Sequence, residues 1–282
     1  SAVDTVVAEV APIPETWRAP IVARPPLKLV GAGLGLFAFR TIPLVGRSSE
    51  RDVLWDGVRT VERSGTPHVM VLEGPAGVGK SRLVQWMAAR ADELGAAIVL
   101  HATHGENPAA AHGLGRMLSR NLRCVGLDPS KSASLVQTSL EAAGVRDPYE
   151  WKALLSAALG DGAGPVRFHN RDERYAVVHR HLVRLGAERP VIVWLDDVQW
   201  GKDALAFARY VLDRRGQGPC PVLFLLTHRG GPLPEIDGQR DTERLPLETL
   251  EDDAQSELIE ELLSLSPGLA THVRERTAGN PL

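Results

Sequence analysis

A glycine-rich turn over residues 74–81 constrains the fold of this chain more than any other feature. It reads Gly74-Pro75-Ala76-Gly77-Val78-Gly79-Lys80-Ser81, which matches the pattern G-x-x-x-x-G-K-[ST]. A buried strand is expected before the turn, over residues 68–73, and a helix after it, over residues 81–94. Glycines let the backbone curl until successive N–H groups face a phosphate, and the positive end of the following helix faces the same anion. The turn therefore predicts an α/β fold with a phosphate-binding loop.

Each part of this loop has an expected task. The Lys80 ammonium is expected to reach the β and γ phosphates of a nucleotide, where it assists catalysis, and the Ser81 hydroxyl to ligate Mg²⁺. From average composition, the pattern arises by chance in roughly one in a hundred chains of this length, so the match is informative. The nucleotide contacts predicted here are Gly74, Pro75, Ala76, Gly77, Val78, Gly79, Lys80, Ser81 and Arg82.

Two further strand ends supply candidate catalytic groups. Asp196 and Asp197 follow the apolar run 191–195, at the end of a strand where ligands of open α/β sheets gather. Asp196 is expected to hold the metal and Asp197 to orient the attacking water. Two aspartates after a strand can also simply cap a helix, but the glycine-rich loop favours the metal site. Thr227 or Arg229, after the apolar run 222–226, is expected to contact the γ-phosphate, although a solvated cation is the other interpretation of Arg229.

Continuous apolar strands alternate with helices along most of the chain, which predicts a parallel sheet covered on both faces. We expect a three-layer P-loop NTPase with a mostly parallel five-stranded sheet. Its strands are expected at 68–73, 97–100, 191–195, 222–226 and, as an edge strand, 244–247. Helices are expected to begin at residue 48, to fill most of 108–186, and to span 203–214, 251–263 and 267–277.

Composition limits the environment and the partners of the chain. Lys and Arg number 32 against 35 Asp and Glu in 282 residues, so nucleic acid and anionic membranes are not expected partners. The longest apolar run, 29–39, would rise only about 16 Å as a helix, roughly half a bilayer core. Two widely separated cysteines suit a reducing, cytoplasmic environment. No signal-peptide pattern opens the chain, and both ends are expected to be cuts through a larger protein.

The first 42 residues are rich in proline and have no helical period: they contain five prolines, and a sixth, Pro43, follows directly. They are predicted to form a linker outside the core, with 31–39 as a segment that docks on the next domain. The core is predicted over residues 43–248.

Several segments together resemble the signal-transduction ATPases with numerous domains (STAND), within the AAA-like branch of P-loop proteins. They are Leu44-Val45-Gly46-Arg47 followed by Glu50, Asp196-Asp197-Val198-Gln199-Trp200, Thr227-His228-Arg229 and Gly279-Asn280-Pro281-Leu282. The resemblance implies ATP or ADP with Mg²⁺, and adenine between Val45-Gly46-Arg47 and Pro281. It also implies that residues 249–282 begin a small helical lid, truncated here. Residues 33–47 resemble linkers that join bacterial serine/threonine kinases to such ATPases.

The function expected from these features is an ATP-binding, slowly hydrolysing regulatory switch with covalently linked signalling domains and nucleotide-dependent self-association. An origin-recognition-like ATPase acting on DNA is one alternative, although such proteins usually carry an Asp-Glu pair and a basic appendage. A nucleotide-locked scaffold without hydrolysis is the other. No guanine-specifying Asn-Lys-x-Asp segment occurs, which favours ATP over GTP.

Overall fold

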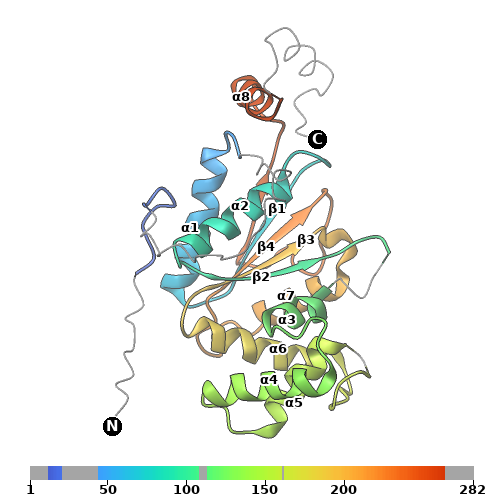
Figure 1. Cartoon of the computed structure of the whole chain (residues 1–282). Helices are drawn as coiled ribbons and strands as arrows, with labels where there is room; N and C mark the ends of the chain where they lie inside the picture. The colour runs from blue at the N-terminus through green and yellow to red at the C-terminus, as the bar shows by residue number, and fades with distance from the viewer. Residues whose placement is uncertain (1–11, 21–43, 108–112, 161, 264–282) are drawn as a thin grey trace, which may run out of the picture.

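A five-stranded parallel sheet forms the centre of the molecule (Figure 1). The computed structural model describes residues 12–20, 44–107, 113–160 and 162–263. The strand order is β2-β3-β4-β1-β5, and every neighbouring pair is parallel. The strands are β1 (His68–Glu73), β2 (Ile98–Thr103), β3 (Val191–Asp196), β4 (Val222–His228) and β5 (Thr242–Pro246). The predicted α/β P-loop class is confirmed, with all described strands parallel.

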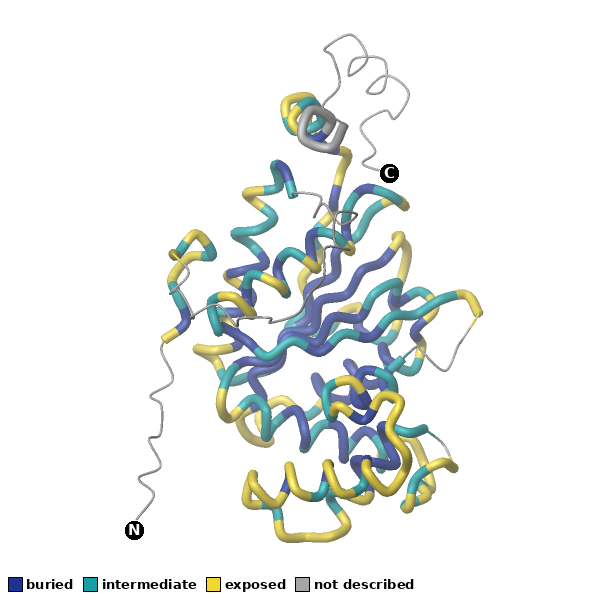
Figure 2. The backbone as a smooth tube through the Cα atoms, viewed as in Figure 1, coloured by how far each residue is buried: buried dark blue, intermediate teal, exposed yellow. Residues whose placement is uncertain are grey.

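Helices cover both faces of this sheet. Those described are α1 (Ser48–Ser64), α2 (Lys80–Glu93), α3 (Gly113–Asn121), α4 (Pro129–Ala142), α5 (Pro148–Leu159), α6 (Arg171–Gly186), α7 (Lys202–Leu212) and α8 (Asp252–Leu263). One hydrophobic core lies between the sheet and α1 and α2, and a second between the sheet and α3, α6 and α7. Figure 2 shows the buried central strands and the largely exposed α4 outside this second layer.

Two helices within the predicted helical region 108–186 begin at an aspartate cap. Asp128 accepts hydrogen bonds from the backbone N–H groups of Ser130 and Lys131, with Pro129 as the first residue of α4. Asp147 caps α5 in the same way, again followed by a proline. An aspartate cap satisfies N–H groups that lack a partner within the helix, and proline has no N–H to leave unpaired.

Residues 12–20 pack against the sheet-covering helices, so the expected free linker is wrong for this segment. Ile13 is 9% exposed and belongs to the core beneath α1. Trp17 packs edge-on against Trp86 of α2, with 5.0 Å between ring centroids. The indole N–H of Trp55 donates to the Pro14 carbonyl at 3.1 Å. We call residues 12–20 the strap; the predicted docking segment 31–39 lies outside the described residues.

The chain continues from β5 into α8, where the sequence predicts the lid to begin. Val45, Leu250 and Leu258 form a small apolar cluster there, with Ala254 packed against it. The remaining predicted lid helix and Pro281 lie outside the described residues. Within the described part of the chain, no helix is both long and apolar enough to span a bilayer.

Candidate functional site

The glycine-rich loop joins β1 to α2 at the carboxyl edge of the sheet. A Cβ at Gly74 would lie 2.5 Å from the Leu247 carbonyl oxygen, so no larger residue fits this close approach. Gly79 has φ 98° and precedes α2, whose amino terminus has no side-chain cap. A Cβ added at Gly79 would meet nothing within 4 Å. Open space before an uncapped helix terminus suits a phosphate group, because the first N–H groups of a helix need acceptors.

Lys80 is held inside this loop. Its Nζ donates to the carbonyl oxygens of Gly74 and Pro75, both at 2.7 Å, and the residue is 7% exposed. Burial lowers the pKa of Lys80, whereas Asp197 and Asp196 act in the opposite direction. The ammonium group therefore lies at the phosphate-binding loop. A bound phosphate would give Lys80 a charged hydrogen-bond acceptor in place of the two uncharged carbonyl oxygens.

Asp196 joins three elements at one carboxylate oxygen. Its Oδ1 accepts hydrogen bonds from Ser81 Oγ of α2 at 2.7 Å and from Thr227 Oγ1 of β4 at 2.6 Å. Hydroxyl and carboxylate oxygens are the ligands that Mg²⁺ prefers, usually one or two from protein with the rest from phosphate and water. No group of three His, Cys, Asp or Glu residues suited to a metal occurs among the described residues. Ser81 and Asp196 thus fit a magnesium ion that a nucleotide helps to hold.

Asp197 is fixed from several sides. Its backbone N–H donates to Thr227 Oγ1 at 2.8 Å, and its Oδ1 accepts from Gln199 Nε2 at 2.8 Å. Arg229 Nε lies 3.8 Å from the same oxygen. Asp197 has φ 54°, and only two other non-glycine residues in the described part have positive φ, Arg47 and Arg123. Such conformations concentrate at functional sites, and Asp197 and Arg47 are both predicted site residues.

A cavity of about 610 Å³ opens beside the loop. Arg47 links its walls: its guanidinium donates to the Val78 carbonyl at 3.2 Å, to the Glu248 carbonyl and to Glu50 Oε1 at 2.8 Å. Burial alone would raise the pKa of the Glu50 carboxyl, but this bond from Arg47 helps to lower it. The lining residues are Gly46, Arg47, Ser48, Ser49, Glu50, Val53, Leu245, Pro246, Glu248, Thr249, Leu250, Glu251 and Ala254.

The structure brings most predicted site residues to one edge of the sheet. The loop, Ser81, Asp196, Asp197 and Arg229 converge there, and the segment 45–47 lies next to them, with Val45 buried under α8. Arg82 instead donates to Gln85 Oε1 at 3.1 Å on its own helix. Pro281 lies outside the described residues.

Sequence reasoning did not single out the cavity wall over residues 245–251 or the contact of Gln199 with Asp197. The sequence signal for Gln199 is its position two residues after Asp197, from which its side chain can reach the Asp197 carboxylate.

A phosphate-binding loop between β1 and α2, facing an acidic pair at the end of β3, with β4 between the two strands, defines this molecule as a P-loop NTPase. Residues 43–225 match the family model described as the AAA ATPase domain. The chain belongs to that family.

One curated relative is much longer than this chain. Protein R02095 of Rhizobium meliloti (strain 1021) is 26% identical over 260 residues, which cover 85% of this chain and 24% of the relative. The chain thus spans about a quarter of that protein's length.

Solved structures with a similar fold include a STAND protein with a tetratricopeptide repeat sensor from Pyrococcus horikoshii. It has 16% identity and a TM-score of 0.45, over 86% of this chain and 29% of that chain. The ORC1 protein of Aeropyrum pernix in complex with DNA has 17% identity and a TM-score of 0.48. That match covers 85% of this chain and 57% of the ORC1 chain.

Proposed function

We propose that this chain is the ATP-binding, slowly hydrolysing switch module of a larger STAND-type signalling or transcription-regulating protein. The observation that carries the proposal is the contact of Ser81 with Asp196, because it brings the two proposed magnesium ligands together, one from the phosphate loop and one from the acidic strand. Membership of the AAA ATPase family supports nucleotide binding. The length of the Rhizobium relative supports covalently linked domains outside this chain.

In the reaction, water attacks the γ-phosphorus of ATP, an O–P bond forms, and the bond to the β-phosphate oxygen breaks to give ADP and inorganic phosphate. Asp197 orients the water and receives its proton, which leaves with phosphate or solvent. Lys80 and Arg229 balance the charge on the phosphate oxygens, and Ser81 and Asp196 would hold magnesium. When bound, Mg²⁺ supplies positive charge to the β and γ phosphates.

The base is proposed to occupy the cavity beside Arg47. A ligand there contacts both the start of α1 and the segment that leads into α8. A ligand shifts a conformational equilibrium only through contacts that differ between the two states, and a bridge between core and lid provides such contacts.

Competition binding tests the base site. ATP and ADP are expected to bind at least about tenfold more tightly than GTP, some 1.4 kcal/mol. Tripolyphosphate, which has no base, should compete less well than ATP. Equal affinities for ATP and GTP would remove the adenine pocket from the proposal and leave a general phosphate-binding loop.

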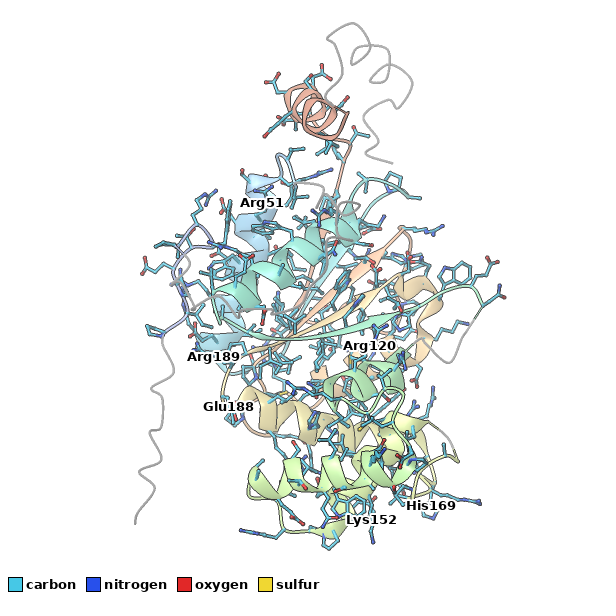
Figure 3. All side chains as sticks on the ribbon, in the orientation of Figure 1. Arg51, Arg120, Lys152, His169, Glu188 and Arg189 are labelled. Carbon is cyan, nitrogen blue, oxygen red and sulfur yellow. The ribbon has the colours of Figure 1, made fainter. Side chains whose placement is uncertain are left out.

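Lys80→Ala tests the phosphate loop. Loss of the ammonium removes a charge-assisted contact to phosphate worth about 1.5–3 kcal/mol, so ATP affinity should fall more than tenfold. Titration calorimetry measures the affinity, and Lys152→Ala is the matched control, because Lys152 is exposed on α5, far from the loop (Figure 3). Unchanged ATP affinity in Lys80→Ala would show that this lysine does not bind the phosphates.

A further inference from the structure

The turn after β3 contains a side chain to which the proposed chemistry assigns no task. Gln199 lies in the short 3-10 turn Val198–Trp200, between the acidic pair and α7. Its Nε2 donates to Asp197 Oδ1 at 2.8 Å. Its Oε1 is buried and accepts no hydrogen bond from the described residues. Because a buried carbonyl oxygen without a donor is costly, this oxygen requires explanation.

The turn fixes Gln199 relative to Asp197. Val198 is fully buried and anchors the turn in the core beneath it. The Trp200 N–H donates to the Asp197 carbonyl at 3.1 Å, and the Gly201 N–H donates to the Val198 carbonyl at 2.8 Å. The Gln199 amide therefore reaches the carboxylate from a backbone with little freedom, as a group that must orient a reactant requires.

The contacts at the Asp197 carboxylate are one-sided. Gln199 binds Oδ1, and Arg229 approaches the same oxygen. The described residues place no hydrogen bond on Oδ2. Asp197 Oδ2 and Gln199 Oε1 are thus two acceptors on neighbouring side chains. A water molecule has two O–H donors, so a single water between these two oxygens would satisfy both acceptors.

We propose that Gln199 is a second water-orienting residue of the hydrolytic site, a role that rests on the function proposed above. Its Nε2 holds the Asp197 carboxylate, and its Oε1 accepts one O–H of the attacking water, while Asp197 Oδ2 accepts the other. The amide neither gains nor loses a proton. The proton of the water passes to Asp197, so the overall reaction is unchanged.

Two substitutions at Gln199 separate these contacts, and a third provides a control. Gln199→Ala removes both the donor and the acceptor. Gln199→Glu keeps the shape but cannot donate to Asp197 and places a like charge beside it. Gln137→Ala is the matched control, because Gln137 makes the same kind of bond, to Glu141 Oε1 at 2.7 Å, on the exposed helix α4.

The measurements are kcat, the Kd of ATP, and the Kd of the ADP–aluminium fluoride complex, which imitates the phosphoryl group in transfer. Gln199→Ala is expected to lower kcat about tenfold or more and to leave ATP affinity within about twofold. Its affinity for ADP–aluminium fluoride should fall by a similar factor. Gln199→Glu should lose at least as much turnover, and Gln137→Ala none.

Three results would overturn the role of Gln199. One is turnover in Gln199→Ala within about twofold of wild type. Another is a loss of kcat matched by equal losses of ATP affinity and thermal stability, which indicates a structural residue. If the wild type itself shows no turnover, the proposed hydrolysis fails, and the aluminium fluoride measurement decides about Gln199. Equal affinities of wild type and Gln199→Ala for that complex would then exclude its role.

Discussion

Replacing Asp197 with asparagine is expected to lower ATP turnover at least about 100-fold and to leave Mg-ATP affinity within about threefold. A positioned general base contributes roughly 10²–10⁴ to a rate, and asparagine cannot take a proton from water. Asparagine tolerates the positive φ of this position and keeps an oxygen acceptor for Gln199 Nε2, so the fold around the site should persist. The measurement is phosphate release at saturating ATP, together with titration of the nucleotide.

Two further variants make the comparison specific. Asp196→Asn is expected to give the opposite result, weaker magnesium-dependent ATP binding, because Asp196 and Ser81 are the proposed metal ligands. Asp213→Asn removes a half-exposed carboxylate that pairs with Arg209 on α7, and it should leave both quantities unchanged. Equal turnover in wild type and Asp197→Asn would favour the nucleotide-locked scaffold over the hydrolysing switch.

The sequence predicts the sheet and the phosphate loop well because both depend on local patterns. The runs 191–195 and 222–226 are continuously apolar, and the structure buries them on both faces of the sheet. Since the carboxyl ends of parallel strands share one edge, Asp196 and Thr227 could be expected near the loop from the strand order alone. Asp196 Oδ1 accepts hydrogen bonds from both Ser81 and Thr227, which shows this arrangement.

The cavity walls depend on a contact between distant segments, which no local pattern contains. Arg47 reaches the Glu248 carbonyl, 201 residues later in the chain, because β5 pairs with β1 and returns the chain to the loop. The side chain of Gln199 is a different case. Its position follows from the sequence, but its contact with Asp197 depends on the rotamer that the buried turn selects.

The strap was missed because its anchors are isolated. Ile13 and Trp17 are four residues apart among prolines, without the repeated apolar spacing that identifies a helix or strand. Pro-rich composition indicates extended backbone. An extended segment can either remain in solvent or pack on a folded domain that offers an apolar surface to its side chains. The surface here is formed by α1 and α2, which come later in the chain.

The strap touches the two helices that begin at the candidate site. The Arg90 guanidinium of α2 donates to the Trp17 carbonyl at 2.7 Å, and the Trp17 indole N–H donates to Asp52 of α1 at 2.7 Å. Arg51, labelled in Figure 3, lies over the Trp17 and Trp86 rings and also donates to the Leu44 carbonyl. Arg51 thus links the strap to Leu44, which precedes the segment 45–47 beside the cavity.

Trp17→Ala is accordingly expected to destabilise the domain by about 2 kcal/mol. Truncating a fully buried tryptophan costs roughly 3–5 kcal/mol, and Trp17 is only partly buried. Its edge-on pair with Trp86 contributes about 0.5–1.5 kcal/mol of the loss. For a domain of this size, about 2 kcal/mol lowers Tm by about 4–8 °C. Thermal unfolding followed by circular dichroism measures the change.

Deleting residues 1–20 should cost at least as much as Trp17→Ala. Trp17→Ala can at most abolish docking of the strap, whereas the deletion abolishes it completely. The free energy of docking already includes the entropy that the segment loses when it becomes ordered. Arg18→Ala is the comparison within the strap, because the Arg18–Asp52 pair is about half exposed and such surface pairs contribute little. Arg18 also lies over the Trp17 ring at 4.2 Å, so its loss should lower Tm, but by less than Trp17→Ala does. If the deletion and Trp17→Ala melt at the wild-type temperature, the strap does not dock in solution, and residues 12–20 are the free linker that their composition first suggested.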